Sequence, residues 1–447
     1  MQLKKSRRSV QSALMAASCA LIAAPAIRAQ SADDSVAGDW QADSALLYYK
    51  ENQGRVQAIE PVVSLAKDFG DEHVLGLKLT YDSLSGGSPN GALPSHTAQT
   101  FATPSGSSLT APTGGTQTYT TPSGREVAQL ERVTLYTTPP GGIPLDPNFH
   151  DQRIALSASW QQPLGAATRF TAGADLSHEM DFMSAGANAA LAHDFNNKNT
   201  TLSLGANFEA DAIRPIGGVP IAGSDYVLLE KGGNETKTVG GGQLGLTQVF
   251  SRYWLAQLNY SYDSARGYQT DPYKILSVID AGGNAIGYRF EARPSARARQ
   301  SLYLENKFAI GRDVLDLSLR YLKDDWGIRS QTAELRYRWE LANGAYVEPH
   351  VRYYKQTAAD FYSLYLNAAD ALPQFMSADP RLASFKGTTF GVKLGLPLSD
   401  SSELSVRVEQ YQQTAQDVPL AFGQLQGLDL NPGLKSLVVQ FGFRFRF

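Results

Sequence analysis

The final segment of the chain alternates strictly between apolar and polar residues. The apolar row is Leu437, Val439, Phe441, Phe443, Phe445 and Phe447, and the intervening row is Ser436, Val438, Gln440, Gly442, Arg444 and Arg446. Successive side chains of a strand point to opposite faces, so a period of two predicts a strand with one apolar face. A soluble sandwich can produce the same alternation, but it seldom ends on Phe in a strand that carries four Phe residues. The segment is typical of the last strand of a membrane barrel, and Phe443, Phe445 and Phe447 are expected to be its insertion signal.

The same alternation recurs along most of the chain. It is clear in the segments 75–82, 153–161, 315–321 and 332–339, whose apolar rows tend to close on Tyr, Trp or Phe. Aromatic girdles of this kind lie at the two interfaces of membrane barrels. Beyond residue 29 no run of eighteen apolar residues occurs, which excludes transmembrane helices. A soluble secreted protein or a transmembrane β-barrel remains.

The first 29 residues differ from the rest. Lys4, Lys5, Arg7 and Arg8 precede an apolar run over 13–27, which is the pattern of a secretory signal peptide cleaved after Ala29 or, nearly as well, after Ala26. Cleavage removes five basic residues from a chain with 40 basic and 43 acidic residues, so the mature protein is acidic and no nucleic-acid partner is expected.

The single cysteine, Cys19, also lies in this segment. The mature chain 30–447 therefore has no thiol for a disulfide, a zinc site, a nucleophile or haem attachment. We expect no cofactor.

Short and mostly longer connections alternate between the predicted strands. The tight turns are 68–71, 162–167, 196–199, 251–253, 311–312, 341–344 and 397–402, and the other connections are 84–150, 211–238, 265–298, 357–385 and 413–434, with shorter ones near 50–55, 180–184 and 324–329. Bacterial barrels have short periplasmic turns and longer outer loops. The sequence thus predicts an all-β fold, a transmembrane antiparallel up-and-down barrel of about sixteen strands with both termini in the periplasm.

The longest connection, 84–150, is rich in Ser, Thr, Gly and Pro. Segments of this composition form mobile outer loops, and they also form plugs inside a lumen. Composition does not choose between these two alternatives.

Several segments resemble one known protein family. They are 47–49 through 59–61, 81–92, 323–328, and 348–354 with 359–362. On these segments the chain resembles a family of Gram-negative exported proteins known only as a domain of unknown function. The resemblance covers essentially the whole mature chain and implies an outer-membrane β-barrel, but no activity. Relatives encoded beside exported flavin-attachment and thioredoxin-like proteins hint at an envelope redox context.

The polar faces of the last seven predicted strands carry interleaved acids and bases. The expected lumen-lining residues are Glu305, Lys307, Asp316, Arg320, Glu334, Arg336, Arg338, Glu348, His350, Arg352, Lys393, Arg407, Glu409, Arg444 and Arg446. Opposite charges facing each other across strands brace a sheet. Charged side chains around a pore also select solutes. Both interpretations stay open, and a register slip of one residue would exchange inside and outside.

Asp324 and Asp325 are weak candidates for a cation site, because adjacent carboxylates suit a hard metal ion. The plainer interpretation is a turn, with Gly327 as a turn former and Trp326 as an anchor at the membrane interface.

No catalytic residue can be assigned. The six His are scattered at 73, 96, 150, 178, 193 and 350, without His-x-x-x-His spacing, and Gly-x-Ser-x-Gly is absent. We expect no enzyme, but an outer-membrane pore for small polar solutes. The alternatives are a plugged structural or redox-linked scaffold with a periplasmic partner, and an outer-membrane hydrolase built from distant strands. The expected partners of the barrel are outer-membrane lipid and the barrel-assembly machinery, and its oligomeric state stays open.

Overall fold

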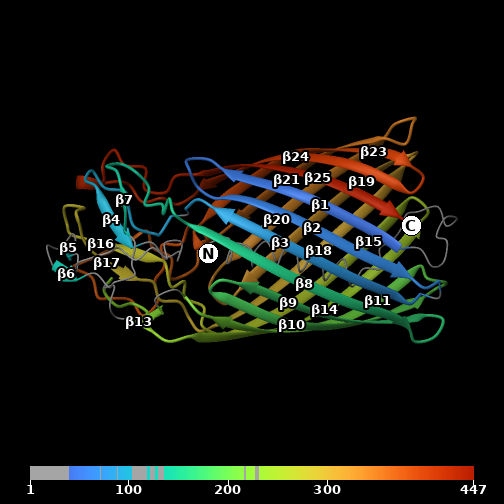
Figure 1. Cartoon of the computed structure of the whole chain (residues 1–447), viewed down its shortest axis with the longest axis horizontal. Helices are drawn as coiled ribbons and strands as arrows, with labels where there is room; N and C mark the ends of the chain where they lie inside the picture. Colours follow the sequence, from blue (N-terminus) through green and yellow to red (C-terminus); the bar gives the residue numbers. More distant parts are fainter. Residues whose placement is uncertain are drawn as a thin grey trace, which may run out of the picture.

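Sixteen strands form a closed antiparallel barrel (Figure 1). The computed structural model describes residues 40–70, 72–87, 89–102, 118–120, 126–128, 135–215, 218–226 and 231–447. The expected signal peptide, 1–29, lies outside these residues. The predicted fold class and strand number are confirmed.

The barrel strands follow one another around the wall in chain order. They are β1 (Trp40–Glu51), β2 (Gln57–Asp68), β3 (Val74–Ser85), β8 (His150–Pro163), β9 (Thr168–Glu179), β10 (Phe182–Phe195), β11 (Thr200–Ile213), β14 (Glu235–Ser251), β15 (Trp254–Gly267), β18 (Ala296–Ile310), β19 (Asp313–Asp324), β20 (Arg329–Glu340), β21 (Tyr346–Gln356), β23 (Phe385–Ser399), β24 (Ser402–Ala415) and β25 (Leu434–Arg446).

The two ends of the chain close the barrel. β1 pairs with β25 from Gln41 opposite Arg446 to Glu51 opposite Ser436. Trp40 and Phe447 exchange backbone hydrogen bonds of 2.7 and 2.9 Å. Closure leaves no sheet edge, so the backbone groups of every barrel strand have partners on both sides.

The alternation of the sequence gives the wall two different faces. On β19, Leu317, Leu319 and Tyr321 are 37, 56 and 41% exposed, whereas the intervening Ser318 and Arg320 are partly covered. The exposed apolar row lies on the outer, convex face, and the polar row faces the lumen. The same pattern of exposure recurs on β8, β11 and β23.

The connections separate into two ends. Each predicted tight turn joins two barrel strands at the end that holds both chain termini, here named the turn end. Aromatic rings gather there: Phe445 stacks on Phe443 and Phe447 at centroid distances of 6.4 and 5.6 Å. The longer connections lie at the opposite end, as the alternation of short and long connections predicts.

These longer connections fold into small sheets beyond the barrel, at the left of Figure 1. We name the described parts of 86–149, 214–234, 268–295, 357–384 and 416–433 the loop cap. Its elements are β4 (Gln99–Ala102) with β7 (Leu135–Thr138), β5 (Thr118–Thr120) with β6 (Glu126–Ala128), β12 (Val219–Pro220) with β13 (Lys231–Gly232), the sheet of β16 (Ile275–Ile279), β17 (Ala285–Phe290) and β22 (Tyr365–Asn367), and the 3₁₀ turns η1 (Pro380–Leu382) and η2 (Gly423–Leu425). Among the described residues, no helix is long and apolar enough to cross a bilayer.

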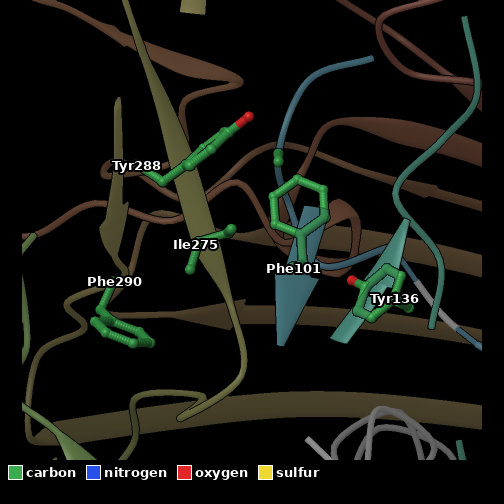
Figure 2. Packing of buried hydrophobic residues seen from close by; sticks show 6 residues of the cluster. Phe101, Tyr136, Ile275, Tyr288 and Phe290 are labelled. Carbon is green, nitrogen blue, oxygen red and sulfur yellow. The ribbon is translucent and has the colours of Figure 1, made fainter. Parts of the chain in front are cut away.

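The loop cap has its own apolar core. Figure 2 shows Phe101 and Tyr136, from β4 and β7, beside Ile275, Tyr288 and Phe290 of β16 and β17. The rings of Phe101 and Tyr288 meet edge to face at a centroid distance of 5.3 Å. The described part of 84–150 therefore includes a packed hairpin, β4–β7, that lies beyond the barrel strands (Figure 1).

Candidate functional site

One wall of the lumen carries a ladder of ion pairs. His350, on β21, lies between Glu409 of β24 at 3.0 Å and Glu334 of β20 at 3.2 Å. Arg407 Nη1 lies 3.6 Å from Glu409 Oε1, and Arg352 Nε lies 3.9 Å from Glu334 Oε2. These side chains come from three strands, β20, β21 and β24. His350 reaches Glu409 across β23, where Gly391 is in register with both residues.

The ladder continues on both sides of this centre. Lys307 Nζ lies 3.4 Å from Glu305 and 3.7 Å from Asp316, and Arg444 Nε donates to Asp43 Oδ1 at 2.7 Å. Further members are Arg336 with Glu334, Arg338 with Glu340, and Arg407 with Glu348. Arg320 lies over the ring of Tyr303, Lys393 lies over the ring of Tyr346, and Arg446 pairs in register with Gln41. Most of the predicted residues thus take part in ion pairs, some across strands and others between residues two apart on one strand, while their role in solute selection stays a prediction.

Inward glycines make room for this ladder. A Cβ at Gly391 would lie 2.6 Å from Cγ of Glu409, and one at Gly387 would lie 2.8 Å from the ring of Tyr411. Each glycine is paired with the strand that supplies the side chain lying across it. Long polar side chains therefore lie flat on the wall.

Gly395 offers a test of this packing. A Cβ there would lie 2.0 Å from the Tyr346 ring, which donates through its hydroxyl to Glu403 at 2.8 Å and supports Arg338. We expect Gly395→Val to lower the free energy of unfolding by about 1–3 kcal/mol, because the ring must leave its place. Urea unfolding in detergent measures this. Gly240→Val is the matched control, since a Cβ there meets nothing within 4 Å. Equal losses in both variants would contradict the packing.

The facing wall is acidic. Asp175 on β9, Glu209 on β11 and Asp263 on β15 point inward at positions that alternate with exposed residues. The inward bases of β8–β15 lie near the strand ends, and each is paired: Arg153 with Asp82 at 2.6 Å, Arg169 with Asp194 at 2.6 Å and Lys237 with Asp211 at 3.1 Å. Sequence reasoning missed this wall because it considered only the last seven strands.

A second charged cluster lies buried in the loop cap. Arg293 contacts Glu291 and Asp379, each at 2.7 Å, and Ser377 donates to Glu291 at 2.6 Å. Arg381 binds Asp379 as well as Asp271, the latter at 3.2 Å. The carboxylates of Asp271, Glu291 and Asp379 are at most 1% exposed.

The cluster ties three loops together. Its charged residues come from 268–295 and 357–384, while Lys274 donates to the carbonyl of Pro89 in 86–149. Such a network fixes the relative position of the loops, because each charge is held by partners from another segment.

The pKa of Asp379 sets a pH dependence for the loop cap. Burial by itself raises the pKa of Asp379, but Arg381, Arg293 and Lys274 outweigh burial and hold it well below its usual range. A carboxyl whose pKa is lower in the folded than in the unfolded state stabilises the fold at pH above about 4, and this contribution is lost as the pH falls through the folded pKa.

We therefore expect hydrogen-exchange protection factors of the β16 amides to be lower at pH 3 than at pH 6. In Asp379→Asn this difference should shrink, because the titrating carboxyl is gone. An unchanged difference in the variant would contradict the assignment to Asp379.

The hairpin around Asp324 corrects one sequence-based interpretation. Asp324 accepts from the backbone N–H groups of Trp326 and Ile328 and binds Arg297, so it forms the turn. Trp326 was expected to anchor the chain at the membrane interface, which is wrong. It is 4% exposed, donates to the carbonyl of Ala296 and packs on Phe361, because the segment 357–384 folds over it.

In the part of the chain that the structure describes, no group of three or more His, Cys, Asp or Glu is placed to hold a metal ion. Asp325 accepts a hydrogen bond from the backbone of Ala298. The hydrogen bonds and ion pair of Asp324 and Asp325 thus support the turn interpretation of this pair.

A closed antiparallel barrel with an apolar outer face, a polar lumen and short turns at the end holding both termini has the architecture of an outer-membrane barrel protein. The chain belongs to the family described as "Protein of unknown function (DUF3570)", whose model matches residues 11–445. The resemblance found in the sequence is thereby confirmed. No curated protein matches the chain.

Several solved structures are similar to this chain. A bacterial polysaccharide outer-membrane secretin has 9% identity and a TM-score of 0.43, covering 93% of this chain and 100% of that one. The outer-membrane protein OpdK of Pseudomonas aeruginosa has 10% identity and a TM-score of 0.38, covering 92% and 99%. The monoaromatic hydrocarbon channel CymD has 10% identity and a TM-score of 0.37, covering 92% and 88%.

Proposed function

We propose that this protein is an outer-membrane pore that passes small polar solutes. The observation that carries the proposal is that a wide, closed barrel has a polar inner face. Barrels of about sixteen strands leave an aqueous channel, whereas eight-stranded ones are filled by side chains. The inner face here carries acids, bases, hydroxyls, amides and glycines, which water solvates well.

The proposed orientation follows from the connections. The turn end faces the periplasm and the loop cap faces the outside, as in bacterial barrels generally. Residues 1–29 act as a signal peptide, and Phe443, Phe445 and Phe447 direct insertion by the barrel-assembly machinery. Fractionation of cells that express the full chain tests this location. The mature protein should be found in the outer membrane, with a mobility that changes on heating, and recovery in the soluble periplasm would contradict it.

Swelling of proteoliposomes tests the pore. Vesicles containing the refolded mature chain should swell in isotonic solutions of small neutral sugars, with rates that fall as the sugar grows. Vesicles without protein are the control. Equal swelling with and without protein would refute a passive pore.

A capped scaffold is the second candidate, and the loop cap favours it. Its cores and buried charges hold several loops together at one end of the barrel. Deleting 86–148 would remove Leu93, Phe101 and Tyr136 from those cores. Conductance in this deletion variant, together with no conductance in the intact chain, would favour the scaffold. A redox role of the scaffold would need a partner that supplies thiols.

A further inference from the structure

We propose that a row of bases on the outer face of the barrel binds the phosphate groups of glycolipids in the outer leaflet of the membrane. The bases lie at the loop end of the strands, and we name them the cation row: Lys50, Lys323, Arg329, Lys355, Lys386 and Lys435. This inference rests on the proposed orientation, with the loop cap outside, and not on the passage of solutes through the lumen.

The cation row lies just beyond the apolar band of the outer face. All its members are exposed, and each holds the last or next-to-last position of its strand at the loop end. Lys323 and Lys355 lie two residues beyond Tyr321 and Tyr353, which are 41 and 42% exposed on the same face. Aromatic rings of this kind mark the interface of a membrane barrel. Because a strand rises about 3.3 Å per residue, the bases lie about 7 Å beyond the rings, among the lipid headgroups.

The row occupies one side of the barrel. Its strands follow one another around the wall from β19 through β20, β21, β23, β24 and β25 to β1, and only β24 contributes no base. Arg266 of β15 lies apart from the row, because the outer residues of the intervening β18 are neutral. On the other side, the corresponding outer positions of β9, β10, β11 and β14 pair in register and hold His178, Met183, Ala212 and Thr236. The bases therefore form a patch and not an even girdle.

Like charges face each other directly within this patch. Lys323 is in register with Arg329, and Lys355 is in register with Lys386. Like charges directly opposite each other destabilise a sheet. Among the described residues, no ion pair joins the cation row to a carboxylate, whereas lumen bases such as Arg444 are paired. The sheet therefore holds two opposed pairs of cations whose repulsion an anion from outside the chain would offset.

The position of the patch selects a phosphorylated lipid. Directly opposed residues have Cβ atoms about 5 Å apart, so both bases of a pair can reach one phosphate group. Ammonium and guanidinium groups both bind phosphate through charge-assisted hydrogen bonds. The acyl chains of the same molecule lie along the apolar face below, which on β19 and β21 carries Leu319 and Val351, 56 and 42% exposed. A soluble anion would gain only the contacts with charge, because it has no acyl chain to place there.

The test measures binding of lipid A by native mass spectrometry of the refolded mature chain in a neutral detergent. Lipid A that carries two phosphate groups should bind about tenfold or more tightly than its dephosphorylated form. Lys355→Gln with Lys386→Gln should weaken binding about tenfold or more, since each base near an anionic lipid surface contributes about fivefold. The control Arg252→Gln with Arg312→Gln removes the same charge from exposed bases at the turn end and should bind like the intact chain.

Thermal unfolding separates binding from a purely structural role. In detergent without lipid A, the Lys355→Gln, Lys386→Gln variant should unfold at a temperature at least as high as the intact chain, because a repulsive pair is gone. With lipid A present the order should reverse, since the ligand stabilises the chain that binds it more tightly. Lys323→Gln with Arg329→Gln repeats the comparison at the other pair, in case the first variant fails to fold.

Three results would overturn the inference. They are equal binding of the two forms of lipid A, equal weakening in the turn-end control, and displacement of lipid A by inorganic phosphate at the same concentration, which would indicate a site for free anions. Each of these results leaves the barrel and its pore standing. Recovery of the chain in the soluble periplasm would instead refute the location on which the inference rests.

Discussion

Replacing Asp379 with alanine should lower the free energy of unfolding of the loop cap by about 3–5 kcal/mol. Asp379 is 1% exposed and binds both Arg293 and Arg381, so its removal leaves these two cations with only Glu291 and Asp271 as partners in a largely buried site. Removing one partner of a buried ion pair is costly because the other charge stays buried with fewer partners. The barrel wall should keep its stability, because its strands are closed by their own hydrogen bonds.

Native-state hydrogen exchange measures both regions in one sample. Protection of the β16 and β17 amides should fall, while that of β11 and β14 should not. Asp370→Ala is the matched control, since Asp370 is exposed and its carboxylate accepts a hydrogen bond from the Asn367 side chain. A loss below about 1 kcal/mol, or an equal loss in the barrel strands, would contradict the role given to this cluster.

Replacing Leu204 with arginine should destabilise the protein in lipid by about 2–4 kcal/mol. Leu204 lies on the outer face of β11 and is 57% exposed, which places it toward the acyl chains. A charge at the middle of the bilayer loses its hydration there. The neighbouring Ser203 faces the lumen, so Ser203→Arg should cost far less.

Equilibrium unfolding by urea in phospholipid vesicles compares the two variants. Residues 203 and 204 are adjacent, and their side chains point to opposite faces of β11. Comparing the two substitutions therefore tests directly which face is inward. If Ser203→Arg were the more harmful substitution, the assignment of inner and outer faces would be reversed, since a slip of one residue exchanges them.

The barrel could be predicted from the sequence because its signals are local. Alternation over 437–447 and 315–321 reports the two faces of each strand within a few residues, and turns such as 196–199 and 311–312 carry Asn or Gly. Three non-glycine residues, Asn196, Asn197 and Lys198, take positive φ in that first turn. Short turns and period two together set the strand number and the side on which the termini lie.

The loop cap could not be predicted, because its contacts join segments far apart in the chain. Phe101, Tyr288 and Phe290 meet from two loops without any periodic pattern. Arg293 and Asp379 look like ordinary surface charges in the sequence, and only their packing makes them a buried pair. Trp326 was misplaced for the same reason, since the segment that covers it begins about thirty residues later.

The acidic wall is a different case, since its signal was present. Asp175, Glu209 and Asp263 occupy polar positions of alternating segments, like the residues that were predicted to line the lumen. What the sequence lacks is the ring of strands that sets β9 opposite β21. The position of this acidic wall across the lumen from β21 is a property of that closure.

Single-channel conductance of the refolded mature chain in a planar bilayer tests the proposed pore most directly. A preparation whose gel mobility changes on heating, and which is therefore folded, should give large and steady current steps. Their size should vary in proportion to the conductivity of the salt solution, as expected for a water-filled lumen. Silence of both the folded intact chain and the variant lacking 86–148 would contradict an aqueous pore.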